Sequence, residues 1–271
     1  MCHAISVHGL EKSYGSHAVL KGVDFDVIKG EIFALLGVNG AGKTTALSCI
    51  EGLRKYEKGS ITVNGKMGIQ LQSASLPAYI KPMEAVRLFA KWNKASIDES
   101  TLTALGIPAL KNKCYSELST GQKRRLHLAL ALTGNPDILF LDEPTAGLDV
   151  EGRTSLHDLI RGLKAAGKTI VLASHDMAEV ESLCDRIVIL NEGQIVFEGT
   201  ATELTEQMGK HYIIHVKTEQ GSESFETDNI EDALLSLLGS LKQKGSRIRD
   251  IKVDRGTLEQ HFMEMTRRTN I

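Results

Sequence analysis

The stretch IFALLGVNGAGKT at residues 32–44 decides the fold. Residues 32–36 form an apolar run of strand length, and residues 37–44 fit the pattern G-x-x-x-x-G-K-[ST]. In this pattern, glycines allow the backbone to wrap closely around phosphate groups, and the following helix directs its N-terminal N–H groups at the negative charge. The stretch therefore predicts a phosphate-binding loop between a buried strand and a helix, with Lys43 reaching the terminal phosphates and Thr44 ligating magnesium.

Two acidic residues follow a second apolar run, which lies at residues 138–141. A carboxylate at the end of a buried parallel strand lies at the edge where such sheets bind ligands. Asp142 at this position can hold magnesium, and Glu143 can polarise a water molecule that attacks a phosphate. Acids that cap a helix are the alternative interpretation. The phosphate loop upstream favours the catalytic interpretation.

The composition excludes several classes of protein. With 42% apolar and 24% charged residues, the 271-residue chain is typical of a globular protein with a sizeable core. Its net charge of -2 lacks the excess of positive charge that is typical of nucleic-acid-binding proteins, so we expect no nucleic-acid partner. The sequence has no apolar run near the roughly 18 residues of a membrane span and no evident signal peptide. Its four cysteines are scattered without a C-x-x-C pattern, so we expect a cytoplasmic protein with reduced thiols.

Short apolar runs alternate with helical patterns, which predicts an α/β fold with a mainly parallel sheet. The strand-like runs lie at residues 5–10, 19–28, 32–36, 61–63, 138–141, 169–173 and 187–190. The pattern is helical over about residues 82–133. Asn64-Gly65 predicts a hairpin turn after the fourth of these runs, and residues 191–194 predict another after the last.

The character of the chain changes after about Met208, where we place a domain boundary. Beyond it we expect strands at residues 212–217, 224–227 and 248–253, and helices at residues 230–242 and 258–265. Residues 219–232 contain six acids and no base, whereas residues 242–255 contain six bases and two acids. We interpret these two segments as solvated faces that pair with each other, and a regulatory docking surface is the alternative.

Residues 118–125, which read LSTGQKRR, carry a family resemblance. They precede a helical apolar stretch, and Gln122 stands 16 residues before the start of the segment at 138–144. In sequence and in spacing they resemble the signature motif of ABC-type ATPases. Tyr14 resembles the aromatic residue of that family that stacks on adenine, and His175 resembles the switch histidine that contacts the γ-phosphate.

Further motifs follow the order of this family over residues 3–208. Gln72 resembles the glutamine of the loop that couples the nucleotide site to a transporter. Gln70 is the competing candidate, and the position of Gln72 at the exit of a predicted strand favours Gln72. Residues 146–149, which read AGLD, resemble the segment that links the two sites of a dimer. The signature departs from the family at Thr120, where a glycine is usual, but the next residue is glycine and the resemblance implies that the change is tolerated.

The resemblance implies a P-loop ABC ATPase fold with a mainly parallel core sheet, an antiparallel N-terminal β-subdomain and a helical subdomain at about residues 73–134. It implies an ATP-binding domain at residues 1–208 and a small C-terminal α/β domain at residues 209–271. It also implies hydrolysis of ATP with Mg²⁺. The resemblance assigns catalysis to Glu143, His175 and Gln72; ATP binding to Tyr14, Gly37, Asn39, Gly40, Ala41, Gly42, Lys43, Thr44 and Thr45; the signature contact with ATP of the opposite subunit to Ser119, Thr120, Gly121 and Gln122; the inter-site loop to Asp149; and magnesium to Thr44, Gln72 and Asp142.

The assembly that the resemblance implies is a head-to-tail homodimer with two composite sites. It would bind a separate transmembrane permease at the inner face of the cell membrane, and the short helical region with the C-terminal appendage resembles the exporter branch. A soluble ABC ATPase of DNA repair or of ribosomes is one alternative, but the chain shows neither a long coiled-coil insertion nor a second ATPase unit. A small-molecule P-loop kinase would leave the signature, Gln72 and His175 unexplained, and Glu143 disfavours a non-catalytic binding module.

Overall fold

The structure is a computed structural model that describes residues 2–70, 75–207, 212–219, 221–243 and 247–255. The chain divides into two compact units, Met1–Glu198 and Gly199–Ile271. The boundary that the sequence places near residue 208 falls among residues outside the described ranges, so that position stays a prediction. Within the described residues, no helix combines the length and the apolar character that crossing a membrane requires.

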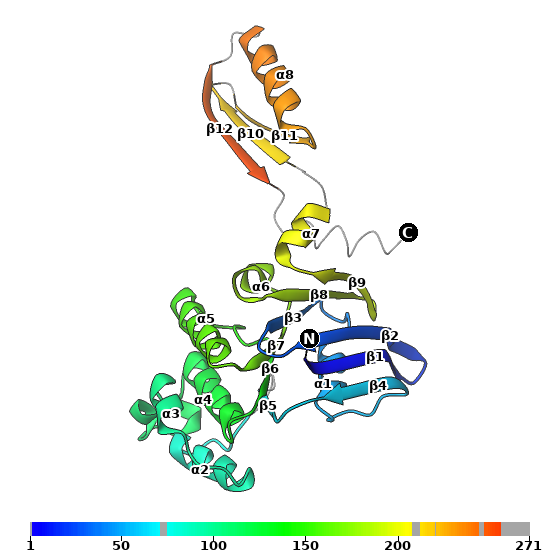
Figure 1. Ribbon diagram of the computed structural model, residues 1–271. Coiled ribbons are helices and arrows are strands. Elements are labelled where there is room, and N and C mark those ends of the chain that lie inside the picture. The colour runs from blue at the N-terminus through cyan, green and yellow to red at the C-terminus, as the bar shows by residue number, and fades with distance from the viewer. Residues whose placement is uncertain (1, 71–74, 208–211, 220, 244–246, 256–271) are drawn as a thin grey trace. The chain divides into compact units, whose positions relative to one another are not determined.

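Two sheets form the frame of the first unit (Figure 1). The smaller sheet is antiparallel and has the order β2-β1-β4, formed by β1 (His3–Tyr14), β2 (His17–Ile28) and β4 (Lys58–Val63). The larger sheet has the order β5-β6-β7-β3-β8-β9. Its strands are β3 (Ile32–Leu36), β5 (Met67–Gln70), β6 (Ile138–Asp142), β7 (Thr169–Ser174), β8 (Arg186–Asn191) and β9 (Gln194–Gly199). The pairs from β5 to β8 are parallel, which confirms the predicted α/β class.

Both faces of the larger sheet are covered, so β3, β6 and β7 are buried along their whole length. Alternate residues of a strand point to opposite faces. Leu141 therefore packs with Leu126 on one face, in a cluster with the helices α4 (Thr120–Leu132) and α5 (Val150–Ala165). Phe140 packs on the other face with Leu47 of α1 (Lys43–Ile50) and with residues of the antiparallel sheet. The sheet is thus held between two apolar layers, and its carboxyl edge is fixed in place.

The remaining helices of this unit are α2 (Pro82–Trp92), α3 (Glu99–Ala104) and α6 (Met177–Leu183). Short 3-10 helices occur at Pro108–Leu110 and Tyr115–Glu117. Together with α4, the helices α2 and α3 occupy the segment in which the sequence predicts a helical region (Figure 1). Their apolar residues join the cluster that covers one face of the larger sheet.

The predicted hairpin at Asn64-Gly65 is wrong. β4 belongs to the antiparallel sheet and β5 belongs to the larger sheet, so the chain crosses between sheets instead of reversing. The backbone N–H of Asn64 donates to the carbonyl of Ala4 at 2.7 Å, and the N–H of Lys66 donates to the Asp137 carboxylate at 2.8 Å. Gly65 has φ 155, which does not fit the tight turn that Asn-Gly favours.

The predicted hairpin at residues 191–194 is confirmed. β8 and β9 are neighbours in the sheet, and the turn residues Glu192 and Gly193 have φ 47 and 80. Two positive φ angles in sequence are those of a type I′ turn, whose twist matches the twist of the flanking strands.

The second unit contains a three-stranded antiparallel sheet and the helices α7 (Ala201–Gln207) and α8 (Ile230–Gln243). The order is β11-β10-β12, with β10 (Tyr212–Thr218), β11 (Ser222–Thr227) and β12 (Ile248–Arg255). Leu237 and Leu241 of α8 pack on Ile214 and Val216 of β10. β11 and β12 lie at opposite edges of β10, so a strand separates the acidic and the basic segment. The helix predicted at residues 258–265 lies outside the described residues.

Candidate nucleotide-binding site

The phosphate loop joins β3 to α1, as the sequence predicts. Two of its glycines are required by the packing. A Cβ atom at Gly37 would lie 2.4 Å from the carbonyl oxygen of Leu190, and Gly42 has φ 110 with the side chain of Leu20 only 2.9 Å from its Cβ position. Any other residue would displace the loop from β8 and β2. The loop is therefore held close to the sheet while α1 begins directly after it.

Lys43 is the cation of this loop, and its side chain is buried. Its ammonium group donates to the carbonyl of Gly37 at 2.6 Å and lies 3.3 Å from that of Val38. Burial lowers the pKa of Lys43, and the nearby carboxylates of Glu143 and Asp142 oppose this effect. A buried ammonium group with carbonyl partners is suited to exchange them for phosphate oxygens. The other predicted loop residues range from exposed to buried: Asn39, Gly40 and Thr44 are exposed, Thr45 is half-buried, and Ala41 is buried.

Asp142 ends β6 and is 5% exposed. The hydroxyl of Thr44 donates to one of its carboxylate oxygens at 3.3 Å, while the other oxygen, Oδ1, is buried without a hydrogen-bond partner among the described residues. Burial raises the pKa of Asp142, and the charge of Glu143 raises it further. A carboxylate with one orphaned oxygen beside a hydroxyl fits Mg²⁺, which prefers oxygen ligands and takes part of them from substrate phosphates. The described residues contain no group of three His, Cys, Asp or Glu side chains that could hold a metal by itself.

Glu143 and His175 lie in contact. The Nδ1 atom of His175 is 2.8 Å from a carboxylate oxygen of Glu143. Glu143 is nearly buried, whereas the His175 side chain is about half exposed. Glu143 has φ 50, a left-handed conformation that is unfavourable for a residue with a side chain, and its N–H donates to the carbonyl of Ala173 at 2.9 Å. The structure thus brings together two of the three side chains that the sequence predicts for catalysis, at the carboxyl ends of β6 and β7, while the third, Gln72, lies outside the described residues.

The signature residues begin α4. Ser119 is the N-cap of this helix: its hydroxyl accepts from the N–H of Gln122 at 3.3 Å, and the side chain of Gln122 accepts from the N–H of Ser119 at 3.2 Å. Ser119 and Thr120 are exposed. Asp149 caps α5 in the same way, through the N–H of Gly152 at 2.8 Å. The signature and the predicted inter-site loop line one cavity of about 520 Å³, so the structure places them side by side.

Tyr14 lies at the end of β1, and its ring is exposed. Lys12 and Arg54 place cationic groups 5.4 and 5.5 Å from the ring centroid. Gln72 lies outside the described residues. Its competitor Gln70 is the last residue of β5, and its side-chain oxygen is buried without a hydrogen-bond partner among the described residues.

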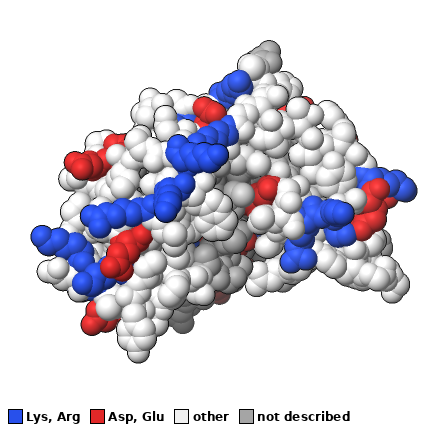
Figure 2. All heavy atoms as spheres, turned by 90° about the horizontal axis from the view of Figure 1, so that it is seen from below, with Lys and Arg blue, Asp and Glu red and all other residues white. Residues whose placement is uncertain are grey.

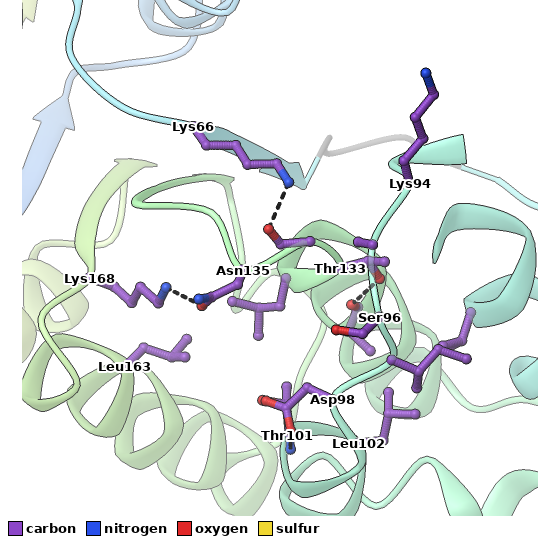
Figure 3. Close-up of a pocket in the computed structure, with 16 residues that line it drawn as sticks. Lys66, Lys94, Ser96, Asp98, Thr101, Leu102, Thr133, Asn135, Leu163 and Lys168 are labelled. Carbon is purple, nitrogen blue, oxygen red and sulfur yellow. Dashed lines mark hydrogen bonds between the residues drawn. The ribbon is translucent and has the colours of Figure 1, made fainter. Parts of the chain in front are cut away.

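A second cavity, of about 560 Å³, lies at the opposite edge of the larger sheet (Figure 3). Lys66, Asn135 and Lys168 border it, and they precede β5, β6 and β7, respectively. Lys66 donates to the carbonyl of Gly134, and Lys168 donates to the side chain of Asn135. The predicted phosphate loop lies at the carboxyl edge, so this cavity is separate from the predicted site.

Sequence reasoning missed two buried carboxylates that lie near the acidic residues of this site. Glu51 is the C-cap of α1, and burial raises its pKa to about 7, with a further contribution from the charge of Asp142. Glu179 of α6 is 3% exposed and accepts a hydrogen bond from Ser174 at 2.6 Å. Neither residue stands in a motif, and their burial depends on elements that are distant in the sequence.

Comparisons with known proteins point to one family. A family model described as ABC transporter matches residues 20–146. The chain is 33% identical to the linearmycin resistance ATP-binding protein LnrL of Bacillus subtilis, over 82% of this chain and 77% of that protein. It is 31% identical to the daunorubicin resistance ATP-binding protein DrrA3 of Streptomyces coeruleorubidus, over 97% of this chain and 96% of that protein.

A solved structure described as the ATP-binding subunit of an ABC transporter has the same fold. It matches with a TM-score of 0.70 at 28% identity, over 76% of this chain and 93% of the other. A phosphate-binding loop fits relatives that are named as ATP-binding proteins. The chain therefore belongs to the family of ABC transporter ATP-binding subunits, and it is an ABC transporter ATPase.

Proposed function

We propose that this chain hydrolyses ATP to drive export through a separate transmembrane permease, at the inner face of the cell membrane. The relatives support the direction, because two of them are named for resistance to linearmycin and to daunorubicin. The observation that carries the catalytic part is the contact between Glu143 and His175, at the sheet edge where Lys43 and Asp142 also lie.

The geometry supports a separate chemical role for each of these residues. The loop at residues 37–44 binds the phosphates through its N–H groups and Lys43. Glu143 accepts a proton from the attacking water, and its nearly buried carboxylate is oriented by His175 at 2.8 Å. Asp142 and Thr44 would hold Mg²⁺, which neutralises charge on the phosphates when bound. Gln72 completes this proposal as the residue that resembles the coupling glutamine.

The exposed signature supports a homodimer. Ser119 and Thr120 are open to solvent beside the inter-site loop of Asp149, so they offer a surface to the nucleotide of a second copy. One chain carries each motif once, so two copies in head-to-tail arrangement complete two sites. Tyr14 would stack on adenine in place of its present contacts with Lys12 and Arg54.

Exposed apolar side chains on α2 support a protein partner. Leu88 and Trp92 are 53% and 78% exposed, and a spacing of four residues places them on one face of the helix. Tyr79, just before this helix, is 85% exposed. On the face shown in Figure 2, the described Lys and Arg side chains are interspersed with Asp and Glu, so this face carries both signs of charge. We therefore take the exposed apolar side chains of α2 as the proposed contact with the permease.

The catalytic proposal is tested with Glu143→Gln. The variant keeps the size of the side chain and removes the base, so we expect ATP binding to remain and hydrolysis to fall by roughly 10²- to 10⁴-fold. Binding of a fluorescent ATP analogue and release of phosphate measure the two effects separately. Turnover near that of the wild type would exclude Glu143 as the base.

The transport proposal is tested by purifying the tagged chain from native membranes in mild detergent, followed by mass spectrometry. We expect a polytopic membrane protein in stoichiometric amount. Trp92→Ala should weaken its recovery, and Lys111→Ala, at an exposed position on another segment of the same helical region, serves as the control. Recovery of ribosomal or DNA-associated proteins without a membrane protein would contradict the proposal.

A further inference from the structure

Glu179 holds the residue that directly precedes His175. Its carboxylate accepts a hydrogen bond from the hydroxyl of Ser174 at 2.6 Å. The two neighbours of Ser174 in the chain both contact Glu143: the carbonyl of Ala173 accepts from the Glu143 N–H at 2.9 Å, and the Nδ1 atom of His175 lies 2.8 Å from the Glu143 carboxylate. The Glu179 carboxylate therefore fixes the residue that lies between these two contacts.

This connection is buried. Ser174 and Glu179 are 0% and 3% exposed, so water does not compete for this hydrogen bond. Burial raises the pKa of Glu179, and the hydrogen bond from Ser174 opposes that rise. Removing the carboxylate would leave the buried hydroxyl of Ser174 without its acceptor, which is costly inside a protein.

The turn around His175 is fixed by the same group of residues. The hydroxyl of Ser174 accepts from the N–H of Asp176 at 3.0 Å, and Asp176 accepts from the N–H of Glu179 at 3.2 Å. Arg153 of α5 binds the Asp176 carboxylate at 3.0 Å. His175 therefore lies between Ser174 and Asp176, which are two members of a closed ring of hydrogen bonds that Glu179 completes.

We propose that Glu179 is a positioning residue that sets the contact between Glu143 and His175. This inference rests on the roles proposed for those two residues in ATP hydrolysis. Glu179 contacts neither of them directly in the hydrogen bonds described, and it acts through Ser174. It fixes the start of the loop after β7, because Ser174 ends that strand and donates to the Glu179 carboxylate. Loss of this control displaces the base from the water it must activate, and such displacements lower the rate of the chemical step.

The test is the steady-state kinetics of the full chain with Glu179→Ala and Glu179→Gln. For Glu179→Ala we expect kcat to fall by about 10- to 100-fold with KM for ATP changed by less than about threefold. Glu179→Gln keeps a side-chain oxygen that can accept from Ser174, so it should restore kcat to within about threefold of the wild type. Glu181→Ala, at an exposed position on the same helix, is the matched control and should leave kcat unchanged.

A second experiment separates positioning from general stability. In a His175→Ala background, Glu179→Ala should lower kcat by less than about twofold more, because the contact it maintains is already absent. Equal losses in both backgrounds, or an unchanged kcat for Glu179→Ala alone, would overturn the proposal. If Glu179→Ala does not fold, Ser174→Ala removes the donor instead. It should lower kcat in the wild-type background and by less than about twofold more in the His175→Ala background, and equal losses in the two backgrounds would count against the proposal.

Failure of the proposed function would give results that differ from failure of the Glu179 inference. If His175→Ala and Glu143→Gln both keep the wild-type rate, the catalytic roles proposed for these two residues are wrong. This conclusion holds whatever the kinetics of the Glu179 variants. If those two variants lose activity and Glu179→Ala does not, the roles stand and the positioning role of Glu179 is refuted. Binding of the fluorescent ATP analogue should be retained by all of these variants.

Discussion

The buried carboxyl group of Glu51 makes stability depend on pH. Glu51 is 8% exposed at the end of α1, and burial raises its pKa from the ordinary value of 4.5 to about 7, helped by the charge of Asp142. The difference corresponds to about 3 kcal/mol, at about 1.4 kcal/mol for each pH unit. Because the folded state binds this proton more tightly than the unfolded state, ionisation of Glu51 lowers the stability of the fold. Stability is unaffected by this group below about pH 4.5, falls as the pH rises to about 7, and stays reduced above that.

Glu51→Gln isolates this effect, because it keeps the shape of the side chain and cannot ionise. The variant and the wild type should have similar free energies of unfolding near pH 4.5. Near pH 8 the variant should be more stable by up to about 3 kcal/mol. Urea unfolding of the larger unit, followed by circular dichroism in nucleotide-free buffer, measures the difference at each pH.

The control is Glu181→Gln, at an exposed carboxyl group of α6. It should shift stability by no more than about 0.5 kcal/mol at either pH. A difference between Glu51→Gln and the wild type that is the same at pH 4.5 and at pH 8 would refute the reasoning, because it would show that Glu51 ionises without cost. A variant less stable than the wild type at pH 8 would refute it as well.

Other predictions concern the loop and the core. Lys43→Ala should reduce the affinity for ATP at least about 10-fold in equilibrium binding, because a charge-assisted contact with phosphate is lost; unchanged affinity would contradict the assignment of the loop. Gly37→Ala places a Cβ 2.4 Å from the carbonyl of Leu190, so the free energy of unfolding should fall by about 1–3 kcal/mol, as urea unfolding would show. Gly162→Ala has open space in α5 and should instead raise it by about 0.5–1 kcal/mol. Leu126→Ala, in the fully buried cluster under the sheet, should cost about 2–5 kcal/mol in the same assay.

The edge of the sheet could be predicted from the sequence because its signals are local. The apolar run at residues 32–36 coincides with β3, and the run at residues 138–141 lies within β6. The ligand-bearing residues follow these strands directly, and parallel strands bring their carboxyl ends to one edge. Glu143 and His175 were therefore predicted at the same edge from two separate motifs, and the structure places them 2.8 Å apart.

The hairpin at Asn64-Gly65 was predicted wrongly because a local signal competes with long-range pairing. Asn-Gly favours a tight turn when both flanking strands pair with each other. Here the preceding strand pairs with β1, and the N–H of Lys66 is bound by Asp137, which is 71 residues away. Those partners are absent from the window of sequence in which the turn was predicted, so the chain continues into the larger sheet.

The contacts that hold Glu143 in place also join residues that are far apart in the sequence. Glu143 has φ 50, and a non-glycine residue in a strained conformation persists only when its surroundings hold it there, at a cost of about 1–3 kcal/mol. Its N–H is bound by the carbonyl of Ala173, and the next residue, Ser174, donates to Glu179 on a helix more than thirty residues after Glu143. A chain with alanine at position 179 would keep the phosphate loop, the acidic pair and the signature unchanged. If the positioning role of Glu179 is correct, that chain would match the same motifs and hydrolyse ATP slowly, so the motifs are sufficient to predict binding of the nucleotide and insufficient to predict its turnover.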